Sequence, residues 1–282
     1  MASGPTTLSA AHVVGSVIGT RSLSSHFTRV ELDVPALGDL DMPREGDTAV
    51  GIYFGDGPSW PSSPGRTYTV RVHDPDTARM AVDVYLHGDG IGTVWANSAR
   101  VGDRVVVAHA RSWYRPPPAI DWQLLVADMA ALPALARILD APHEHPTRAV
   151  VHVTDRSDLD YLPRRPDVEL IALLATGDWE SGGDLVRRAT ECLPAGGRGY
   201  CWFAGEARQA RAMRRHLRGE LGWETNELDV MGYWRRHSAE WDERFAGVGA
   251  ELYSVYAAAL RSGTSEKTAL EEFDEALERA GL

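Results

Sequence analysis

The sequence predicts three parts: an N-terminal six-stranded antiparallel β-barrel, a C-terminal doubly wound α/β domain with a parallel sheet, and a helical tail. Short β-rich segments separated by Gly, Pro, Asp and Ser fill the first part. Apolar strands then alternate with segments of helical spacing, as in a sheet covered on both faces. The chain of 282 residues is long enough for two ordinary domains. We place the three parts at residues 1–119, 120–235 and 236–282.

The barrel is predicted from six strand-like segments. They lie at residues 12–18, 26–34, 48–54, 66–73, 80–86 and 104–108, with one helical stretch near 93–100. Six short antiparallel strands are typical of a small closed barrel. The run Pro116-Pro117-Pro118 then ends regular structure and is expected to be the linker between the domains.

The second part alternates strands and helices. Strands are expected at 122–127, 149–153, 168–174 and 200–204, and helices at 130–139, 183–192 and 206–221. In the tail, Trp241, Phe245, Val248 and Leu252 recur at spacings of three or four residues, which predicts an amphipathic helix. Ser262-Gly263 interrupts this pattern, and a second helix is expected after it.

The composition excludes several classes of protein. A net charge of −11 without a long basic run disfavours a nucleic-acid partner. No apolar run approaches the roughly 20 residues that a membrane span requires, and no secretory signal precedes residue 17, so we expect a cytoplasmic protein. Two cysteines, Cys192 and Cys201, are too few for a disulfide framework or a zinc site. No metal site is expected.

The segment Arg66-Thr67-Tyr68-Thr69 has the pattern of a ligand-binding strand. In a strand, Arg66 and Tyr68 share one face, and Thr67 and Thr69 share the other. A flat aromatic ligand can stack on Tyr68, and a guanidinium on the same face can pair with a phosphate of that ligand. Thr69 can offer its hydroxyl or backbone N–H to a ring nitrogen.

A glycine-rich turn follows a later strand and leads into a helix. It runs His87-Gly88-Asp89-Gly90-Ile91-Gly92-Thr93-Val94-Trp95. Its glycines allow the backbone to approach a ligand closely, and the first N–H groups of the helix attract phosphate. We expect Thr93 to be the N-cap of this helix.

These motifs and several later ones resemble a known family. The matching segments are Arg66–Arg71, Val82–Gly88, Gly90 to Ala96, Gly102-Asp103, Leu124–Asp128, Ala131–Ala134, Trp202–Ala207, Arg214–Leu217 and Gly232–Arg235. In this order and at these distances they resemble the siderophore-interacting proteins, FAD-dependent ferric-siderophore reductases of the ferredoxin-reductase-like superfamily. The resemblance covers roughly residues 12–236.

The resemblance implies a role for each matching residue. Arg66 would contact the FAD pyrophosphate, Tyr68 would stack on the isoalloxazine, and Thr69 would lie near its N5 edge. The rest of the implied FAD site comprises Thr67, His87, Gly88, Gly90, Thr93, Val94 and Trp95, with Gly90, Thr93 and Val94 taking phosphate oxygens. Asp128, Ala130 and Ala131 would lie beside the FAD and nicotinamide contacts. Gly205 and Glu206 would lie where a nicotinamide nucleotide docks, at the carboxyl end of a sheet strand.

The sequence departs from the family pattern at the expected nucleotide site. Ala127-Asp128-Met129-Ala130-Ala131 replaces the family's Gly-Asp-Glu-Thr-Ala, which removes two polar side chains. The electron donor is therefore left open between NADH, NADPH and a ferredoxin. Arg111, Arg235 and Arg236 are expected to attract an anionic ferric siderophore.

The flavin performs the redox chemistry in this interpretation, so no side chain is expected to be catalytic. The predicted activity is reduction of the ferric iron of a siderophore with release of Fe(II), by a monomer or weak dimer. Two alternatives remain: a flavin reductase for another electron acceptor, and a non-catalytic flavin or siderophore binder.

Overall fold

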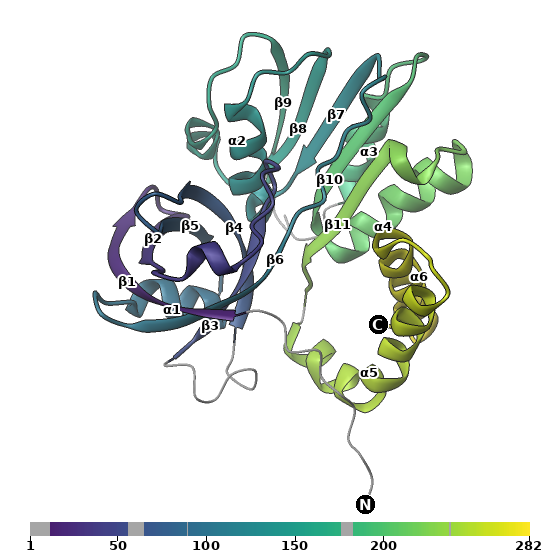
Figure 1. The fold of residues 1–282 in the computed structure, drawn as a ribbon. Helices are drawn as coiled ribbons and strands as arrows, with labels where there is room; N and C mark the ends of the chain where they lie inside the picture. Colours follow the sequence, from purple (N-terminus) through teal and green to yellow (C-terminus); the bar gives the residue numbers. More distant parts are fainter. Residues whose placement is uncertain (1–11, 56–64, 89, 176–182, 237) are drawn as a thin grey trace, which may run out of the picture. The chain divides into compact units, whose positions relative to one another are not determined.

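The structure is a computed structural model that describes residues 12–55, 65–88, 90–175, 183–236 and 238–282. Its residues divide into two compact units, Met1–Tyr233 and Trp234–Leu282. Figure 1 shows the elements of both units. The first unit contains the barrel and the sheet, and the second contains the two helices of the tail.

The first six strands close into the predicted antiparallel barrel. They are β1 (His12–Ser22), β2 (Phe27–Asp33), β3 (Ala49–Phe54), β4 (Gly65–Asp74), β5 (Arg79–Tyr85) and β6 (Arg104–Arg111). They pair in the order β1-β2-β5-β4-β3-β6. Branched side chains that alternate along the strands, such as Val30, Val50, Ile52 and Val107, are fully buried inside the barrel. The six predicted strands are confirmed.

The barrel helix begins earlier than the sequence predicted. Helix α1 spans Ile91–Ser98, and its N-cap is Gly90 rather than Thr93. The Thr93 hydroxyl instead donates to the His87 carbonyl and accepts from the His87 N–H, at 3.0 and 3.1 Å. Thr93 thus lies within the first turn of α1 and bonds it to the loop at His87, and Gly90 is the N-cap.

The second half forms a five-stranded sheet in the order β11-β10-β7-β8-β9. Its strands are β7 (Trp122–Ala127), β8 (Thr147–Val153), β9 (Val168–Leu174), β10 (Gly199–Glu206) and β11 (Leu228–Trp234). The pairs β10–β7, β7–β8 and β8–β9 are parallel. Strand β9 has the predicted bounds and lies at the sheet edge, where Leu170 is 44% and Leu174 40% exposed. Strand β11 had no predicted range.

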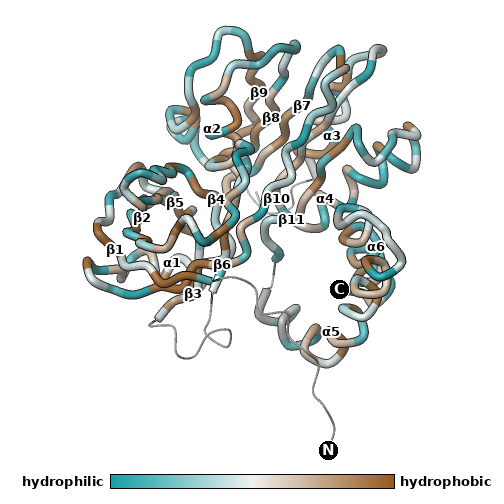
Figure 2. The backbone as a smooth tube through the Cα atoms, viewed as in Figure 1, coloured by the Kyte–Doolittle hydropathy of each residue, from teal (hydrophilic) through white to brown (hydrophobic). Residues whose placement is uncertain are grey.

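Helices cover both faces of the sheet, which confirms the doubly wound domain. Helix α2 (Leu132–Asp140) packs on one face, with Leu125, Val151 and Trp202 in the shared core. Helices α3 (Gly183–Glu191) and α4 (Ala207–Arg215) cover the other face. Figure 2 shows the apolar strands between these helices. The helix expected at 206–221 forms two parts: α4 ends at Arg215, and a π-helical turn follows at His216–Glu220.

The barrel packs against the sheet through the segment around Asp47. The fully buried Asp47 carboxylate accepts hydrogen bonds from the Trp113 and Tyr114 N–H groups and from the Trp202 indole, at 2.8–3.1 Å. Next to it, Gly46 lies against α2, where an added Cβ would be 2.8 Å from the Ile138 Cα. The barrel and sheet therefore share a continuous, hydrogen-bonded boundary.

The tail folds as two helices, α5 (Ser238–Arg261) and α6 (Glu266–Arg279). Both were predicted. Leu252, Ala276, Leu277 and Leu282 form their buried core. The Phe273 ring stacks on Tyr253 with centroids 5.3 Å apart. The break predicted at Ser262-Gly263 is confirmed, because Gly263 has a φ of +86°, which a glycine adopts without strain.

Candidate functional site

Strand β4 carries the four residues Arg66–Thr69 in the alternation that the sequence predicted. Arg66 is exposed, and its guanidinium donates to the Gly65 carbonyl of its own strand at 2.8 Å. Tyr68 is half-buried, whereas Thr69 is only 6% exposed. Arg66 therefore presents a cation to solvent at one end of the segment, and Thr69 lies beneath the surface at the other.

The Tyr68 ring lies between the barrel core and helix α1. Its centroid is 5.8 Å from that of Trp95, which in turn stacks on Phe54 at 4.8 Å. A Cβ at Gly92 would be 2.4 Å from the Tyr68 hydroxyl, so only glycine permits this approach. Burial raises the pKa of Tyr68 well above its usual value. The hydroxyl is buried and, among the described residues, has no hydrogen-bond partner.

The start of α1 leaves backbone donors beside this ring. Val94 N–H donates to the Gly90 carbonyl at 3.0 Å, which commits it to the helix. The first N–H groups of a helix, here those of Ile91, Gly92 and Thr93, have no partner within it. Of the amides that the sequence assigned to phosphate, that of Thr93 thus stays available, whereas that of Val94 does not, and Ile91 and Gly92 add two more.

The turn that precedes α1 is open to solvent. His87 and Gly88 are exposed, and Gly88 has a φ of +50°, a region that glycine adopts more readily than other residues. The His87 ring stacks on Tyr85 with centroids 5.0 Å apart. Asp89 lies outside the described residues.

The carboxyl edge of the sheet brings together Asp128 and Gly205, which are far apart in the sequence. Asp128 follows β7, and a Cβ at Gly205 in β10 would be 2.8 Å from its carboxylate. Asp128 accepts from the Ala130 and Ala131 N–H groups at 3.0 and 3.3 Å. Glu206 caps α4 by accepting from the Arg208 and Gln209 N–H groups. These amides are therefore already bonded to carboxylates, and a nucleotide phosphate would meet negative charge here.

Arg111 reaches β4 from β6, across β3. It is exposed, and its guanidinium donates to the Thr67 hydroxyl at 3.0 Å and lies 5.2 Å from the centre of the Trp113 ring. The preceding His109 has a φ of +56°, at an irregularity in the β3–β6 pairing. The structure thus joins Thr67 and Arg111, for which the sequence predicted separate roles.

Tyr233 was not assigned a site role from the sequence. Burial raises the pKa of its hydroxyl well above the usual value, and Asp47 and Asp128 add to this shift, whereas Thr69 and Arg111 oppose it. The hydroxyl makes no hydrogen bond of good geometry, although Thr69 is its polar neighbour. Tyr233 therefore marks the place where β4, β6 and the sheet edge meet. Tyr233 lies in Gly232–Arg235, one of the segments that resemble the family, and this position could have indicated a site role from the sequence.

Arg235 and Arg236 belong to the second unit. Both are half-buried, and the Arg235 guanidinium lies 4.4 Å from the centre of the Trp241 ring. Their proximity to the barrel strand stays a prediction.

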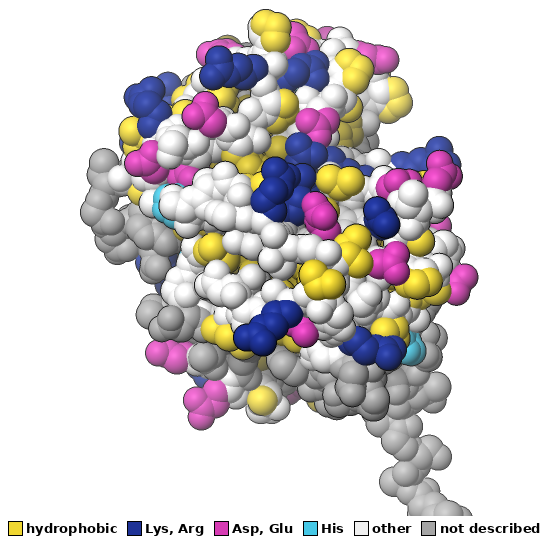
Figure 3. All heavy atoms as spheres, turned by 90° about the vertical axis from the view of Figure 1, so that its left-hand side faces the viewer, with side chains coloured by type: hydrophobic (Ala, Val, Ile, Leu, Met, Phe, Trp, Pro, Cys, Tyr) yellow, Lys and Arg dark blue, Asp and Glu magenta, His cyan; other side chains and the backbone are white. Residues whose placement is uncertain are grey.

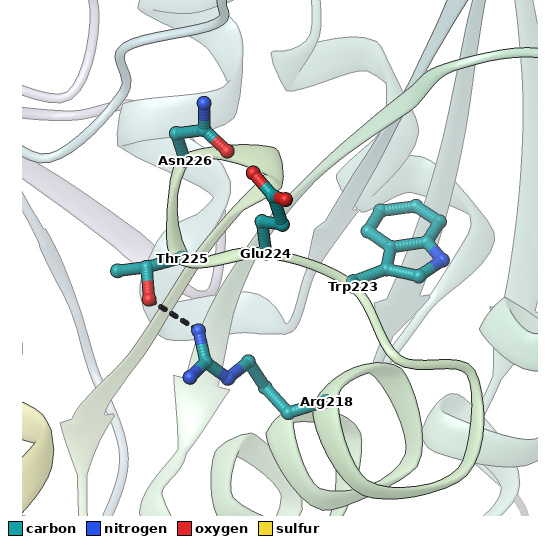
Figure 4. Close-up of a pocket in the computed structure, with 5 residues that line it drawn as sticks. All are labelled: Arg218, Trp223, Glu224, Thr225 and Asn226. Carbon is teal, nitrogen blue, oxygen red and sulfur yellow. Dashed lines mark hydrogen bonds between the residues drawn. The ribbon is translucent and has the colours of Figure 1, made fainter.

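None of these residues lines the pocket of 480 Å³ that the structure contains in the sheet domain. It is lined by Arg218, Trp223, Glu224, Thr225 and Asn226, and Figure 4 shows the Arg218 side chain bonded to Thr225. These residues precede β11, at the amino end of that strand. Ligands of open α/β sheets bind at the carboxyl ends instead, so this pocket is not the expected site.

Within the described ranges, no three His, Cys, Asp or Glu side chains are grouped as metal ligands. Among the same residues, no helix combines the length and apolar character needed to cross a bilayer. Figure 3 shows one face of the molecule, on which basic and acidic side chains are interspersed rather than gathered into a basic patch.

Two family models match the chain and together cover more than half of it. Residues 54–112 match the siderophore-interacting FAD-binding domain, and residues 120–237 match the siderophore-interacting protein model. The chain belongs to the siderophore-interacting protein family. The first match spans β4, the glycine turn and α1, and it supports the expectation of FAD as cofactor.

Relatives and solved structures agree with this membership. The ferric vibriobactin reductase of Vibrio cholerae is 28% identical over 222 residues, 73% of this chain and 74% of its own length. The NADPH-dependent ferric-chelate reductase of Escherichia coli is 27% identical over 184 residues, 63% of this chain and 68% of its own. A siderophore utilization protein from T. fusca superposes with a TM-score of 0.69 at 27% identity, over 80% of this chain and 94% of its own.

The residues around Tyr68 fit an FAD molecule. Strand β4 carries the Tyr68 ring, whose buried hydroxyl has no hydrogen-bond partner among the described residues, and the exposed Arg66. Helix α1 contributes Gly92, which lies against the Tyr68 hydroxyl, and the three amides at its start. These groups supply a stacking surface, backbone donors and a cation, which are the groups that a dinucleotide with a flat ring requires.

Proposed function

We propose that this protein uses FAD to reduce the ferric iron of a siderophore and so releases Fe(II). The observation that carries the proposal is the Tyr68 site on β4 and α1, within the segment matched by the FAD-binding domain. FAD supplies the chemistry when bound, because it takes two electrons from a hydride donor and delivers them singly to iron. Two Fe(III) ions are reduced for each hydride.

The residues of the chain bind and orient the cofactor in this proposal. Tyr68 stacks on the isoalloxazine, Thr69 lies at its N5 edge, and Arg66 pairs with the pyrophosphate. The N–H groups of Ile91, Gly92 and Thr93 take phosphate oxygens. His87 and Gly88 line the open turn. Trp95 holds the Tyr68 ring from behind, because it packs between this ring and Phe54.

The substrate in this proposal is an anionic ferric siderophore drawn by cationic side chains. Arg111 lies next to β4 and contacts Thr67 directly. Arg235 and Arg236 would add positive charge to the same approach. Because the net charge of the protein is −11, such a local cationic rim would set where an anionic chelate binds.

NADPH is the favoured electron donor, since the name of the E. coli relative states that it is NADPH-dependent. Asp128 and Glu206 bond to the amides at the sheet edge, so NADPH would have to place its phosphates on other groups. NADH and a ferredoxin remain the competing donors. We place the reaction in the cytoplasm, where reduced nucleotides are available.

The test is an anaerobic assay of Fe(II) release. The FAD-loaded protein is mixed with a ferric siderophore, a strong Fe(II) chelator and NADPH, NADH or a reduced ferredoxin in turn. We expect Fe(II) to appear at two equivalents for each NADPH consumed. If FAD is bound but no donor yields Fe(II), a different electron acceptor is favoured, and a protein that binds no FAD would overturn the proposal.

A further inference from the structure

Helix α2 of the sheet domain places an arginine on the flavin strand of the barrel. The Arg137 guanidinium donates to the Val70 carbonyl at 2.6 Å. Val70 follows Thr69 directly, so this contact lies about 3 Å further along β4. The pairing of β4 with β5 is irregular between Val70 and Val72. Arg137 therefore holds the backbone at a bulge, where the strand ladder is interrupted.

The position of Arg137 is fixed by its neighbours on α2. Ala136 is fully buried and Ile138 is 1% exposed. Ile138 packs on Gly46 of the barrel so closely that an added Cβ would be 2.6 Å from its side chain. The helix thus cannot rotate or withdraw without breaking the boundary between barrel and sheet. The buried residues on either side of Arg137, Ala136 and Ile138, therefore fix its contact with Val70.

The charge of Arg137 has no ion-pair partner within 4 Å among the described residues. Its neighbour Arg71 pairs with Asp140 at 2.6 Å, and that pair largely cancels itself. Burial lowers the pKa of Arg137 and Arg71 lowers it further, whereas the more weakly acting Asp47, Asp140 and Glu45 raise it. The guanidinium still remains cationic, because arginine does not lose its proton in proteins. A partly buried and unpaired cation exerts a field that solvent screens only weakly.

We propose that Arg137 is a positioning residue for the flavin: it fixes the backbone next to Thr69 and stabilises the negative charge that FAD gains on reduction. This inference rests on the proposed function, because it assumes that FAD lies along Tyr68 and Thr69. It also links the two halves of the protein. Asp128 caps the short 3-10 turn Met129–Ala131 at the sheet edge, and α2 follows this turn directly and carries Arg137 to the flavin strand.

The test compares Arg137→Gln with Arg165→Gln. Arg165 is a matched control because it also donates to backbone carbonyls in the sheet domain, those of Leu139 and Ala141, but does not contact β4. The midpoint potential and visible spectrum of bound FAD, and the thermal midpoint of the holoprotein, are measured for both variants. We expect both variants to lose stability, and only Arg137→Gln to shift the potential to more negative values and move the flavin bands.

Arg137→Lys restores the charge and is expected to bring the potential back toward the wild-type value. If Arg137→Gln does not fold, Arg137→Met, which keeps an unbranched packing stem, takes its place. A potential and spectrum equal to those of Arg165→Gln would overturn the inference while the proposed function stands. A wild-type protein that binds no FAD would overturn both.

Discussion

The Tyr68 side chain connects strand β4 with helix α1, because its hydroxyl lies against Gly92 and its ring lies beside Trp95. The alternation of Arg66-Thr67-Tyr68-Thr69 predicts which side chains share a face, and β4 confirms it. The close approach of Gly92 to the Tyr68 hydroxyl joins a strand to a helix, and no local pattern encodes it. The same holds for Tyr233, which reaches Thr69 only because the sheet packs on the barrel.

Replacing Tyr68 separates the role of its ring from that of its hydroxyl. Tyr68→Ala removes the stacking surface and is expected to weaken FAD binding at least about tenfold, since a stacked aromatic pair contributes about 0.5–1.5 kcal/mol beyond its buried area. Tyr68→Phe keeps the ring and removes a buried hydroxyl without a partner, so the FAD-free protein should gain stability. Fluorescence titration with FAD and urea unfolding measure the two effects. Full FAD affinity in Tyr68→Ala would show that the flavin lies elsewhere.

At the scale of the elements, the sequence predicted strands better than helix starts. Alternation and turn residues locate β1–β6 because each strand buries one face in the barrel core. The start of α1 was misplaced because Thr and Gly are about equally good N-caps, so residue preference does not decide between Thr93 and Gly90. Here the Thr93 hydroxyl bonds to the His87 peptide instead. Whether Thr93 caps the helix or bonds to His87 depends on the conformation of the turn, which residue preferences do not predict.

Asp47 connects a barrel loop to the sheet, and its ionisation should be visible in the stability of the protein. Burial raises the pKa of its carboxyl above 3.8, although hydrogen bonds from Tyr114, Trp202 and Trp113 oppose this shift. The folded state therefore binds more protons than the unfolded state above pH 3.8, and this contribution to stability is lost as the pH rises through the raised pKa.

The variant Asp47→Asn tests this account. It places an amide N–H among N–H donors and is expected to cost about 1–3 kcal/mol of unfolding free energy. Because the cost of ionising Asp47 falls on the wild type alone, the gap between the two should be larger near pH 4 than near pH 7. Asp167→Asn is the control with the opposite sign, since a bond from Arg165 lowers the pKa of Asp167. Urea unfolding at several pH values measures both gaps, and a gap for Asp47→Asn that widens with rising pH would contradict the account.

For the whole chain, the sequence predicts the order of the parts but not the contacts between barrel and sheet. The order of barrel, sheet and helical tail follows from periodicity along the chain. The boundary between barrel and sheet depends on contacts such as that of Asp47 with Trp202, between residues far apart in the sequence. Likewise, Asp128 bonds to the amides of the 3-10 turn before α2, and Glu206 bonds to those at the start of α4, and both contacts depend on the folded edge of the sheet.

Arg235 and Arg236 lie near the start of the second unit, and replacing them tests the proposed attraction of the substrate. Replacing both with Gln should raise the KM for an anionic ferric siderophore several-fold without changing FAD affinity. The difference should shrink at high salt, because exposed charges are screened over about 10 Å at 0.1 M salt. Arg279→Gln, an exposed cation at the end of α6, is the control. An unchanged KM at low salt would remove these two residues from the substrate site.

The proposed function requires FAD bound at Tyr68 to carry electrons from a donor to a ferric siderophore. Its most direct test is the anaerobic visible spectrum of the purified protein, recorded before and after NADPH, then NADH, and then a ferric siderophore. We expect flavin bands that NADPH bleaches and the ferric siderophore restores. Bands that no nucleotide bleaches would point to a protein donor, whereas reduced flavin that the ferric siderophore does not reoxidise would contradict the claim.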